Sequence, residues 1–574
     1  MAQEKYINIA YKRKFGIGHY FTNNFVTDMP CAFRHLFKCW RQSCIGVSLT
    51  GESLFSVVDK DSYKIYKNGQ IAIVYYKIEP DPETLAYLDV ANASRLSPKE
   101  GESLLDRLLK KSDSILAQGR IHGIETALRQ ERLDKNELEA ALKKEGNAKA
   151  RSALDNIVNV LGHNNILEQS HALVAIIAPI SAIMNMQDER FVSSQERSTR
   201  YVKFDEFYIP DSVLRDSGAL RIYKEAIGML DSAYNIAMDE LTGRLEALYD
   251  QKEHHMPNKD YIDTIIVPSA RDLCRGLVPL AKQSVVYFSA NAKTLEAITR
   301  KMLASKDPIN NIAGEGLAQV IMENMPSFSK HLAPTDFDKE YYNAIKKFAL
   351  TNEAPRITDF GSEQVHLNNM TNEEELLRGI ASFAGIEKSE ALEYIKELSS
   401  RRSGKYDALN STVLGMGSML FGIDISMGSL RDLERHRDAI KNYEINDSIC
   451  YLPGELIGGN SFAYVKSAID NAAMARKKLS GMGYAEEAKL LLPLATGARL
   501  MMHMGLGEAL YIIENRSTKE AHPEYRRIAI EMWNALRGSY PSITSAMRSF
   551  VMEGSSAFSR EERGNGSTNK DLLF

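Results

Sequence analysis

The sequence lacks the features of a secreted or membrane-spanning protein. It has five cysteines in 574 residues, too few for a disulfide framework. Its longest apolar stretch, residues 172–184, is shorter than the about 20 residues that cross a bilayer, and Pro179 interrupts it. The first residues contain neither the apolar core nor the cleavage site of a signal peptide. We therefore expect a cytoplasmic protein with reduced cysteines.

An excess of one charge sign is also missing. Lys and Arg number 71 and Asp and Glu number 75, so the formal net charge is −4. A chain so close to balance has no general attraction for nucleic acid or for an anionic membrane, and we expect neither as a partner. A local basic pocket for one nucleotide remains open. The apolar fraction of 44% and the charged fraction of 25% are typical of a globular protein.

Local patterns predict both strands and helices. Asn68-Gly69 lies between two β-prone runs and predicts a hairpin. Residues 172–186 are apolar on nearly all faces, which predicts a central buried helix. Residues 260–302 and 314–325 predict further helices.

A weak internal repeat accounts for the length. The segment Arg271–Lys301 parallels Glu486–Arg516: in each, a basic residue, Arg275 or Lys489, precedes a Pro-Leu pair by four positions. We expect a long apolar helix after each pair. The motifs FYIPD and YLPGE also correspond, at residues 207–211 and 451–455.

The repeat predicts an α+β fold of two tandem, mainly helical units, each with a small antiparallel sheet. The expected boundaries are an N-terminal extension at 1–63, a first unit at 64–350, a second unit at 351–553 and a disordered tail at 554–574. The tail is polar and contains glycine, a composition typical of disorder.

Hydroxyl and guanidinium groups gather between residues 193 and 201. Ser198 and Arg200 are of the residue types that donate several charge-assisted hydrogen bonds to a phosphate. Glu196 would repel a phosphate, so we expect it to contact another group, such as a sugar hydroxyl. A solvated charged loop is the alternative interpretation.

The order and spacing of these residues resemble the flavin-dependent thymidylate synthases. That family has the signature R-H-R-x-x-S-x-N-E-x-S-x-R, an upstream G-H-x-x-x-x-E and a downstream Y-I-P. The first copy matches these motifs at Gly162, His163, Glu168, Ser193, Glu196, Ser198, Arg200, Tyr201 and Tyr208 to Pro210, and further family motifs at Ser94, Arg275, Pro279, Asn291 and Ala292. It departs from them at Asp188-Glu189-Arg190, which replaces Arg-His-Arg, at Lys293 and at Met302, where the family has arginines.

The second copy is degenerate in the opposite half. It keeps Arg435-His436-Arg437, and Arg516 stands where the first copy has Met302. It lacks the serine–arginine half, because Ile445 and Asp447 occupy those positions. The resemblance therefore implies a composite site to which the two copies contribute different edges, in a ThyX-like fold.

The resemblance also implies the reaction and its residues. The expected activity is conversion of dUMP to dTMP, with FAD as cofactor and NADPH and methylenetetrahydrofolate as co-substrates. The implied dUMP-binding residues are Glu196, Ser198, Arg200, Arg275, Arg435 and Arg516, of which Arg200, Arg435 and Arg516 would be catalytic. The implied FAD-binding residues are Ser94, His163, Glu168, Arg190, Asn291, Lys293, His436 and Arg437. Four family-like units would come from a homodimer.

Three alternatives remain open. The chain could be a non-catalytic flavin- or nucleotide-binding homologue with a structural or regulatory role, or it could perform the same chemistry on another pyrimidine. A zinc or iron–sulfur site could use residues at near-helical spacing, namely Cys31, His35, Cys39 and Cys44. No C-x-x-C pair is present and free cysteine is commonly a buried apolar residue, so we expect no metal.

Overall fold

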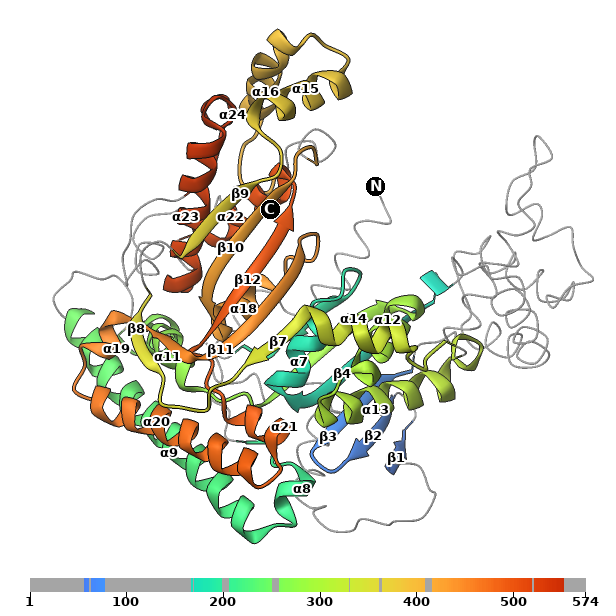
Figure 1. The fold of residues 1–574 in the computed structure, drawn as a ribbon, viewed down its shortest axis with the longest axis vertical. Coiled ribbons are helices and arrows are strands. Elements are labelled where there is room, and N and C mark those ends of the chain that lie inside the picture. Colours follow the sequence, from blue (N-terminus) through green and yellow to red (C-terminus); the bar gives the residue numbers. More distant parts are fainter. Residues whose placement is uncertain are drawn as a thin grey trace, which may run out of the picture. The chain divides into compact units, whose positions relative to one another are not determined.

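The structure is a computed structural model of the chain, whose elements are labelled in Figure 1. It describes residues 56–60, 63–77, 167–168, 170–198, 206–249, 258–329, 331–360, 364–407, 415–518 and 521–551. The segment with Cys31 and Cys44 and the tail expected at 554–574 lie outside the described residues, so the predictions made for them stay predictions.

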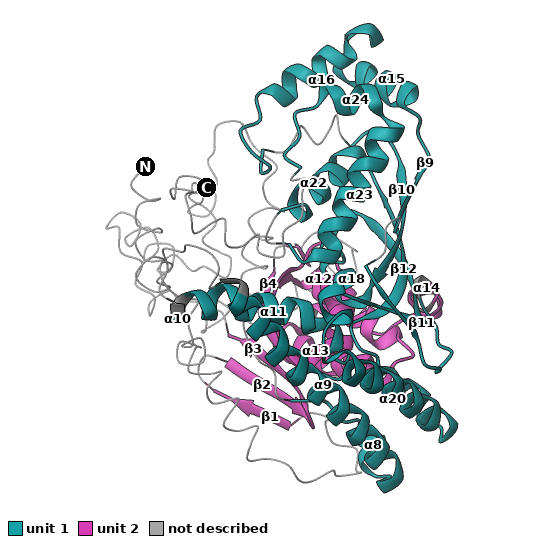
Figure 2. Ribbon diagram, turned by 90° about the vertical axis from the view of Figure 1, so that its left-hand side faces the viewer, with its two compact units in different colours: residues 1–47, 198–282, 345–574 teal, residues 48–197, 283–344 magenta. Residues whose placement is uncertain are grey.

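Two compact units divide the chain (Figure 2). Unit 1 consists of residues 1–47, 198–282 and 345–574, and unit 2 consists of residues 48–197 and 283–344. Each unit combines segments that are distant in sequence. The units are therefore defined by packing in three dimensions and do not correspond to the two copies of the sequence repeat. The repeat boundaries expected at 64, 351 and 554 therefore stay a prediction.

Unit 2 is built on a six-stranded sheet in the order β1-β2-β3-β4-β6-β5, with every neighbouring pair antiparallel. The strands are β1 (Ser56–Asp59), β2 (Tyr63–Asn68), β3 (Ile71–Tyr76), β4 (His171–Pro179), β5 (Ser193–Glu196) and β6 (Gln283–Asn291). The helices are α7 (Ile180–Gln187), α12 (Ala292–Ala304), α13 (Pro308–Asn324), η5 (Pro326–Phe328) and α14 (Asp336–Ile345). Helices α7, α12 and α13 pack on one another and on the sheet, where β3 and β4 supply a buried apolar core.

The hairpin predicted at Asn68-Gly69 is present. Asn68 ends β2 and pairs with Ile71 at the start of β3, so Gly69 and Gln70 form the turn. Gly69 has a φ of +53°, and Gln70 has a negative φ. A glycine at the first turn position fits a type II′ turn, whose twist matches that of the paired strands.

The buried helix predicted over residues 172–186 is wrong in its first half. Residues up to Pro179 form β4, which lies between β3 and β6, and only α7 is helical. A strand buried on both faces shows no alternation of polar and apolar residues, so its pattern matches that of a buried helix. Pro179 has an extended backbone, with φ −64° and ψ 152°, and stands at the junction where the strand ends and α7 begins.

Unit 1 contains a second sheet, in the order β7-β11-β12-β10-β9, with β8 also paired to β11. Its strands are β7 (Lys346–Ala349), β8 (Arg356–Asp359), β9 (Val365–Asn369), β10 (Met419–Ser426), β11 (Ile440–Leu452) and β12 (Thr496–Met504). Strands β7 and β8 run parallel to β11 and the other pairs are antiparallel. The predicted α+β class is confirmed, and this sheet is mixed rather than purely antiparallel.

The helices of unit 1 fall into two sets along the chain. The first set is α8 (Asp211–Leu214), α9 (Ser217–Tyr249), α10 (Asn258–Tyr261), η3 (Ile262–Ile266), α11 (Val267–Cys274) and η4 (Arg275–Leu277). The second set is α15 (Glu373–Ala384), η6 (Lys388–Glu390), α16 (Ala391–Ser400), α18 (Met427–Leu433), α19 (Gly454–Ile457), α20 (Phe462–Gly481), α21 (Ala485–Ala488), η7 (Lys489–Leu491), α22 (Leu506–Arg516), α23 (Pro523–Ser539) and α24 (Pro541–Ala546). Helices α9 and α20 lie side by side (Figures 1 and 2) and share one apolar core.

The apolar runs after the two Pro-Leu pairs are strands, not the predicted long helices. Strand β6 follows the first pair and β12 follows the second, and helices α12 and α22 begin only afterwards. Both strands are central in their sheets, between two hydrogen-bonded neighbours. The first half of β6 is buried on both faces, which removes the alternation that distinguishes a strand from a helix. Strand β12 alternates in burial, but its less buried face carries the apolar Met501, so the sequence pattern is again weak.

The same order of elements occurs twice in the chain. It is strand, short helix, strand, one-turn helix, long helix, 3₁₀ turn, strand and helix. The first set is β4, α7, β5, α8, α9, η4, β6 and α12, and the second is β10, α18, β11, α19, α20, η7, β12 and α22. In both sheets the last strand of the set lies between the other two. Pro210 and Pro453, from the two corresponding motifs, stand at the starts of α8 and α19.

The two Pro-Leu segments pair with each other inside unit 1. Pro279 forms an antiparallel bridge with Pro493. The Leu280 N–H donates to the Leu492 carbonyl at 2.9 Å, and the Leu494 N–H donates to the Val278 carbonyl at the same distance. This reciprocity relates the segments by an approximate two-fold axis, as in an isologous interface. Arg275 and Lys489, at the starts of η4 and η7, occupy equivalent positions about it.

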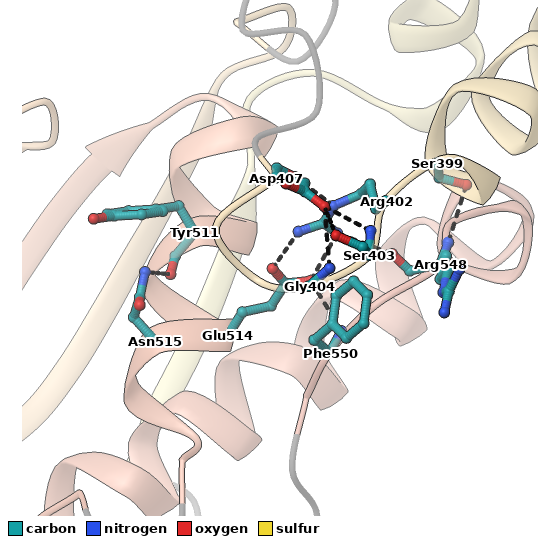
Figure 3. A network of polar contacts seen from close by, with 10 residues as sticks. All are labelled: Ser399, Arg402, Ser403, Gly404, Asp407, Tyr511, Glu514, Asn515, Arg548 and Phe550. Carbon is teal, nitrogen blue, oxygen red and sulfur yellow. Dashed lines mark hydrogen bonds and ion pairs between the residues drawn. The ribbon is translucent and has the colours of Figure 1, made fainter. Parts of the chain in front are cut away.

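A buried polar network holds helix α22 in unit 1 (Figure 3). Arg402 donates to both carboxylate oxygens of Glu514 on α22, at 2.9 and 2.5 Å. Arg402 also donates to the carbonyls of Asp407 and Arg548, and the Phe550 N–H donates to Glu514 at 3.0 Å. The loop after α16 and the segment after α24 are thereby tied to the helix that ends at Arg516.

Candidate functional site: a cluster of arginines around Asp432

Helix α18 and the residues that follow it form one side of the candidate site. The Ser426 hydroxyl caps the helix by accepting from the Ser429 N–H at 3.2 Å, and the helix ends at Leu433. Asp432 therefore lies in its last turn, and Arg435 and His436 follow its end. The sequence and the local structure thus place an acidic residue three positions before Arg435, the first residue of the Arg-His-Arg motif.

Asp432 is the centre of the cluster. The Arg275 guanidinium donates to its carboxylate at 2.8 Å, and Nη2 of Arg435 lies 3.7 Å from the other oxygen. Nη2 of Arg516 donates to the Asp432 backbone carbonyl at 3.0 Å. Three arginines from three distant segments thus meet at one aspartate. Arg275 and Asp432 are largely buried, while 40% of the Arg435 side chain is exposed.

His436 is held as a neutral acceptor. The Arg516 Nε–H donates to its Nε2 at 2.8 Å, so that nitrogen carries a lone pair and the ring proton lies on Nδ1. Burial and the neighbouring charges of Arg516 and Lys441 hold the pKa of His436 well below its usual range. Nδ1 faces the Glu508 carboxylate at 3.6 Å. The histidine therefore positions Arg516 without adding charge at neutral pH.

Tyr525 and Glu524, on helix α23, support the arginines from the interior. The guanidinium carbons of Arg275 and Arg516 lie 5.9 and 5.4 Å from the Tyr525 ring centre, within range of cation–π attraction. Glu524 is fully buried and accepts from the Ser426 N–H at 2.6 Å and from two serine hydroxyls. Burial raises the pKa of Glu524. These contacts fix the arginine geometry before any ligand binds.

The cluster is suited to binding an anion. Among the described residues Nη1 of Arg516 has no hydrogen-bond partner, since its other two nitrogens bind His436 and Asp432. Arg435 is partly exposed, so its guanidinium is accessible to a ligand. Guanidinium groups form strong, charge-assisted and often bidentate hydrogen bonds with phosphates.

The structure brings together four of the residues that the motifs singled out. Arg275, Arg435, His436 and Arg516 form the cluster, although Arg275 comes from the first copy and the others from the second. Ser198 and Arg437 also belong to unit 1. Ser94, His163 and Arg200 lie outside the described residues.

The other predicted residues belong to unit 2. Glu196 ends β5, is buried and accepts from the Ser284 hydroxyl at 2.9 Å, rather than lying on an open surface. Lys293 pairs with Glu168 at 2.7 Å on the surface. The Asn291 side chain caps α12 by accepting from the Thr294 N–H at 2.9 Å. The Arg190 guanidinium lies 5.3 Å from the ring centre of Phe191.

Several members of the cluster were not predicted from the sequence. Asp432 stands three residues before Arg435, and that spacing on a helix is typical of a solvated ion pair. Tyr525 and Glu524 lie in a matched stretch of the second copy, but only the structure shows what they do. Tyr525 packs against two arginines, and Glu524 accepts from the Ser429 hydroxyl, which in turn accepts from Arg275. One sequence feature could have drawn attention to Glu524: it lies in the first turn of α23, directly after His522 and Pro523.

Glu508 gives the site a testable pH dependence. Burial, with the charge of Asp438, raises the pKa of Glu508 from 4.5 to about 7. The folded protein keeps this proton at a pH where the unfolded chain releases it, so stability should fall as the pH rises from about 4.5 to about 7. The loss should be roughly 2 kcal/mol, because the side chain is 18% exposed and partly solvated.

Thermal melting of Glu508→Gln across pH 5 to 8 checks this expectation. At pH 5 the melting temperature of the variant should be equal to or lower than that of the wild type. As the pH rises, the melting temperature of the variant should increase relative to that of the wild type. Glu393→Gln, an exposed glutamate on α16, is the matched control and should follow the wild type. A Glu508→Gln difference that is constant across the range contradicts the assignment.

The comparison with known proteins identifies the chain. The fold and the site define the class of protein: an α+β protein with an arginine cluster suited to a small anion. The sequence matches the family described as thymidylate synthase complementing protein over residues 107–325 and 361–542, and the chain belongs to this family. The resemblance drawn from the motifs is thereby confirmed, and two matched regions are what a tandem duplication predicts.

Curated relatives and solved structures share part of this sequence. A UPF0159 protein of Chlamydia muridarum is 23% identical over 436 residues, which cover 69% of this chain and 80% of the relative. The UPF0159 protein Ta1429 of Thermoplasma acidophilum is 24% identical over 457 residues, covering 68% and 87%. The structure of the UMP/dUMP methylase PolB from Streptomyces cacaoi, bound with 5-Br UMP, is 20% identical, covers 34% of this chain and 96% of its own, and has a TM-score of 0.27. None of the helices in the described ranges is both long and apolar enough to span a membrane.

Proposed function

We propose that the chain is a flavin-dependent methyltransferase that converts dUMP to dTMP, with methylenetetrahydrofolate as one-carbon donor and NADPH as reductant. The observation that carries the proposal is the convergence of Arg275, Arg435 and Arg516 at Asp432 in a member of this family. Ser198, Arg200 and Glu196 remain proposed dUMP-binding residues.

The described residues can perform three parts of this task. Arg435 and the unpartnered Nη1 of Arg516 would donate to the phosphate or to the uracil. The positive charge of Arg275 would offset the negative charge of Asp432, so that the cluster keeps a net positive charge. Positive charge fixed beside the uracil would stabilise the negative charge that develops on the ring during methylation. Neutral His436 and the Tyr525 ring would hold Arg516 in place, so little reorganisation is needed on binding.

The residues proposed for FAD fit it in part. Arg190 is an exposed cation and suits the diphosphate of the cofactor, whereas Lys293 is already paired with Glu168 and fits less well. His436 fits less well as a direct contact, because its ring is buried and bonded to Arg516. Ser94, His163, Glu168, Asn291 and Arg437 remain proposed FAD residues. FAD, when bound, supplies the hydride chemistry of the reaction.

Purified protein tests the proposal directly. We expect a yellow protein with the absorbance band of bound flavin, NADPH oxidation that dUMP stimulates, and formation of dTMP when methylenetetrahydrofolate is present. UMP in place of dUMP tests whether another pyrimidine is the substrate. Colourless protein that ignores added FAD would refute the flavin-dependent activity.

A non-catalytic nucleotide-binding role is the second candidate. It is favoured by Asp188 and Glu189, which stand where the family has two cations. Binding of dUMP without NADPH oxidation or dTMP formation, in protein loaded with FAD, would select this role over the enzyme.

A further inference from the structure

The repeated order of elements raises the question of how many nucleotides one chain binds. Unit 1 contains reciprocal hydrogen bonds between the two Pro-Leu segments, including Ala281 N–H to Leu490 and Ala495 N–H to Gly276, both at 2.8 Å. The sequence repeat gives each residue of the cluster a counterpart in the other copy. Two intact copies would offer two anion-binding positions, one at Arg275 and one at Lys489.

The two equivalent positions differ in chemistry. Arg275 faces Asp432 within the arginine cluster. Lys489 instead pairs with Glu486 at 2.5 Å, and its ammonium lies 4.7 Å from the ring centre of Phe348. The cation at the second position is therefore already neutralised by a neighbour three residues away.

Within unit 2 the counterpart of the Arg-His-Arg edge is neutralised as well. Asp188 and Glu189 follow α7 as Arg435 and His436 follow α18. Lys301 binds Asp188 and lies 3.5 Å from Glu189, and the Lys301 side chain is only 9% exposed. Two partly buried carboxylates paired with one buried lysine offer no net positive charge to a phosphate. Met302, the counterpart of Arg516, is buried and apolar.

In the second copy, the position that corresponds to Arg200 has lost its cation through a separate substitution. Asp447 occupies that position on β11, is buried, and binds Arg476 at 2.7 Å. Its oxygens also accept from the Thr351 N–H at 2.6 Å and the Asn352 N–H at 2.9 Å. Asn352 adopts a left-handed backbone, with φ +54°, to make this contact. A carboxylate saturated by protein donors replaces the cation that a nucleotide would need.

We infer that each chain has a single nucleotide site, the one at Arg275, Arg435 and Arg516, and that the positions equivalent to it in the sequence repeat have been converted into structural ion pairs. The inference rests on the proposed function, because it counts the sites for the proposed substrate. Changes in three separate segments remove the same property, a cation available to an anion, at Lys489, at Asp188-Glu189 and at Asp447. One chain should therefore show no cooperativity between sites of its own.

Equilibrium dialysis of the full chain with radiolabelled dUMP, with FAD added and the protein quantified by amino-acid analysis, tests the count. We expect saturation at one dUMP per chain. Saturation at two per chain overturns the single-site inference and leaves the proposed function standing. No binding at any dUMP concentration overturns the proposed function and this inference with it.

Two variants assign the bound nucleotide to its position. Arg435→Ala should weaken all of the binding, whereas Lys489→Ala should leave both the number of sites and the affinity unchanged. If Lys489→Ala removes half of the bound nucleotide, the equivalent position is a working site and the inference is wrong.

Discussion

The Arg435→Ala variant should bind dUMP about ten- to a hundredfold more weakly than the wild type. A hydrogen bond to a charged group contributes about 1.5 to 3 kcal/mol, and each 1.4 kcal/mol is a tenfold change in affinity. Arg435 is the cluster's most exposed arginine, so its removal should cost affinity rather than folding stability. Isothermal titration calorimetry with FAD-loaded protein measures the change.

Arg499→Ala is the matched control. Arg499 belongs to the same unit, is 64% exposed and makes a two-bond contact with Asp424 on the neighbouring strand. Losing it removes one exposed cation and one ion pair without touching the cluster, so dUMP affinity should stay within about twofold. Equal losses in both variants would mean that general charge, not the cluster, attracts the nucleotide.

The composite-site model predicts a second result from the same calorimetric measurement. Arg200→Ala should weaken dUMP binding as Arg435→Ala does, although the two arginines come from different copies. Normal dUMP binding by either variant contradicts the composite model. The melting temperature of each variant separates a loss of binding from a loss of folding.

The arginines of the site could be predicted because the family motif specifies them by residue type and order. Arg275, Arg435 and Arg516 are each identified by a short pattern around them, and the structure brings them together. Asp432 could not be predicted in the same way. Its role depends on Arg275, which is 157 residues away in sequence, and local spacing explains it equally well as a surface ion pair.

Charge reversal in the first copy was visible in the sequence, but its compensation was not. Asp188 and Glu189 indicated a lost cationic edge. The structure shows that Lys301, next to Met302 on α12, forms ion pairs with both of them. A lysine on a helix is most often a solvated residue, so only the tertiary contact distinguishes this one. From the sequence alone, the replacement indicates a lost binding function. In the folded chain, the two carboxylates form a structural ion pair with a lysine.

The fold was predicted better by class than by element. The hairpin at Asn68 has a local cause, the glycine of its turn, and was found. Strands β4, β6 and β12 were mistaken for helices because each carries apolar residues on both faces, which weakens the two-residue period. Their identity depends on partners that lie as far away in sequence as Asn291 does from His171, information that no local window contains.

The Arg402→Ala variant should lower the free energy of unfolding by about 3 to 5 kcal/mol, the cost of leaving one partner of a buried ion pair uncompensated. Arg402 is 5% exposed and Glu514 is 1% exposed, and two hydrogen bonds join them (Figure 3). Without Arg402, the Glu514 carboxylate would keep only the Phe550 N–H among the described residues. Urea unfolding followed by circular dichroism measures the loss.

Arg401→Ala provides an adjacent control. Arg401 neighbours Arg402 in sequence but pairs with Glu397 one turn back on the surface, with both side chains more than 60% exposed. Exposed pairs of this spacing contribute about 0.3 to 0.5 kcal/mol, so the variant should be nearly as stable as the wild type. Similar losses in Arg401→Ala and Arg402→Ala would show that the buried pair is no more important than a surface pair.

A double variant separates the charge from the packing. Arg402→Met with Glu514→Met removes both charges and keeps apolar volume, so it should be more stable than Arg402→Ala alone. A loss of about 1 to 3 kcal/mol should remain, because the carbonyls of Asp407 and Arg548 and the Phe550 N–H lose their partners. Because Glu514 lies two residues before Arg516 on α22, Arg402→Ala should also weaken dUMP binding, and the double variant should recover part of that affinity. Equal affinity in the wild type and Arg402→Ala would show that α22 keeps Arg516 in place without this ion pair.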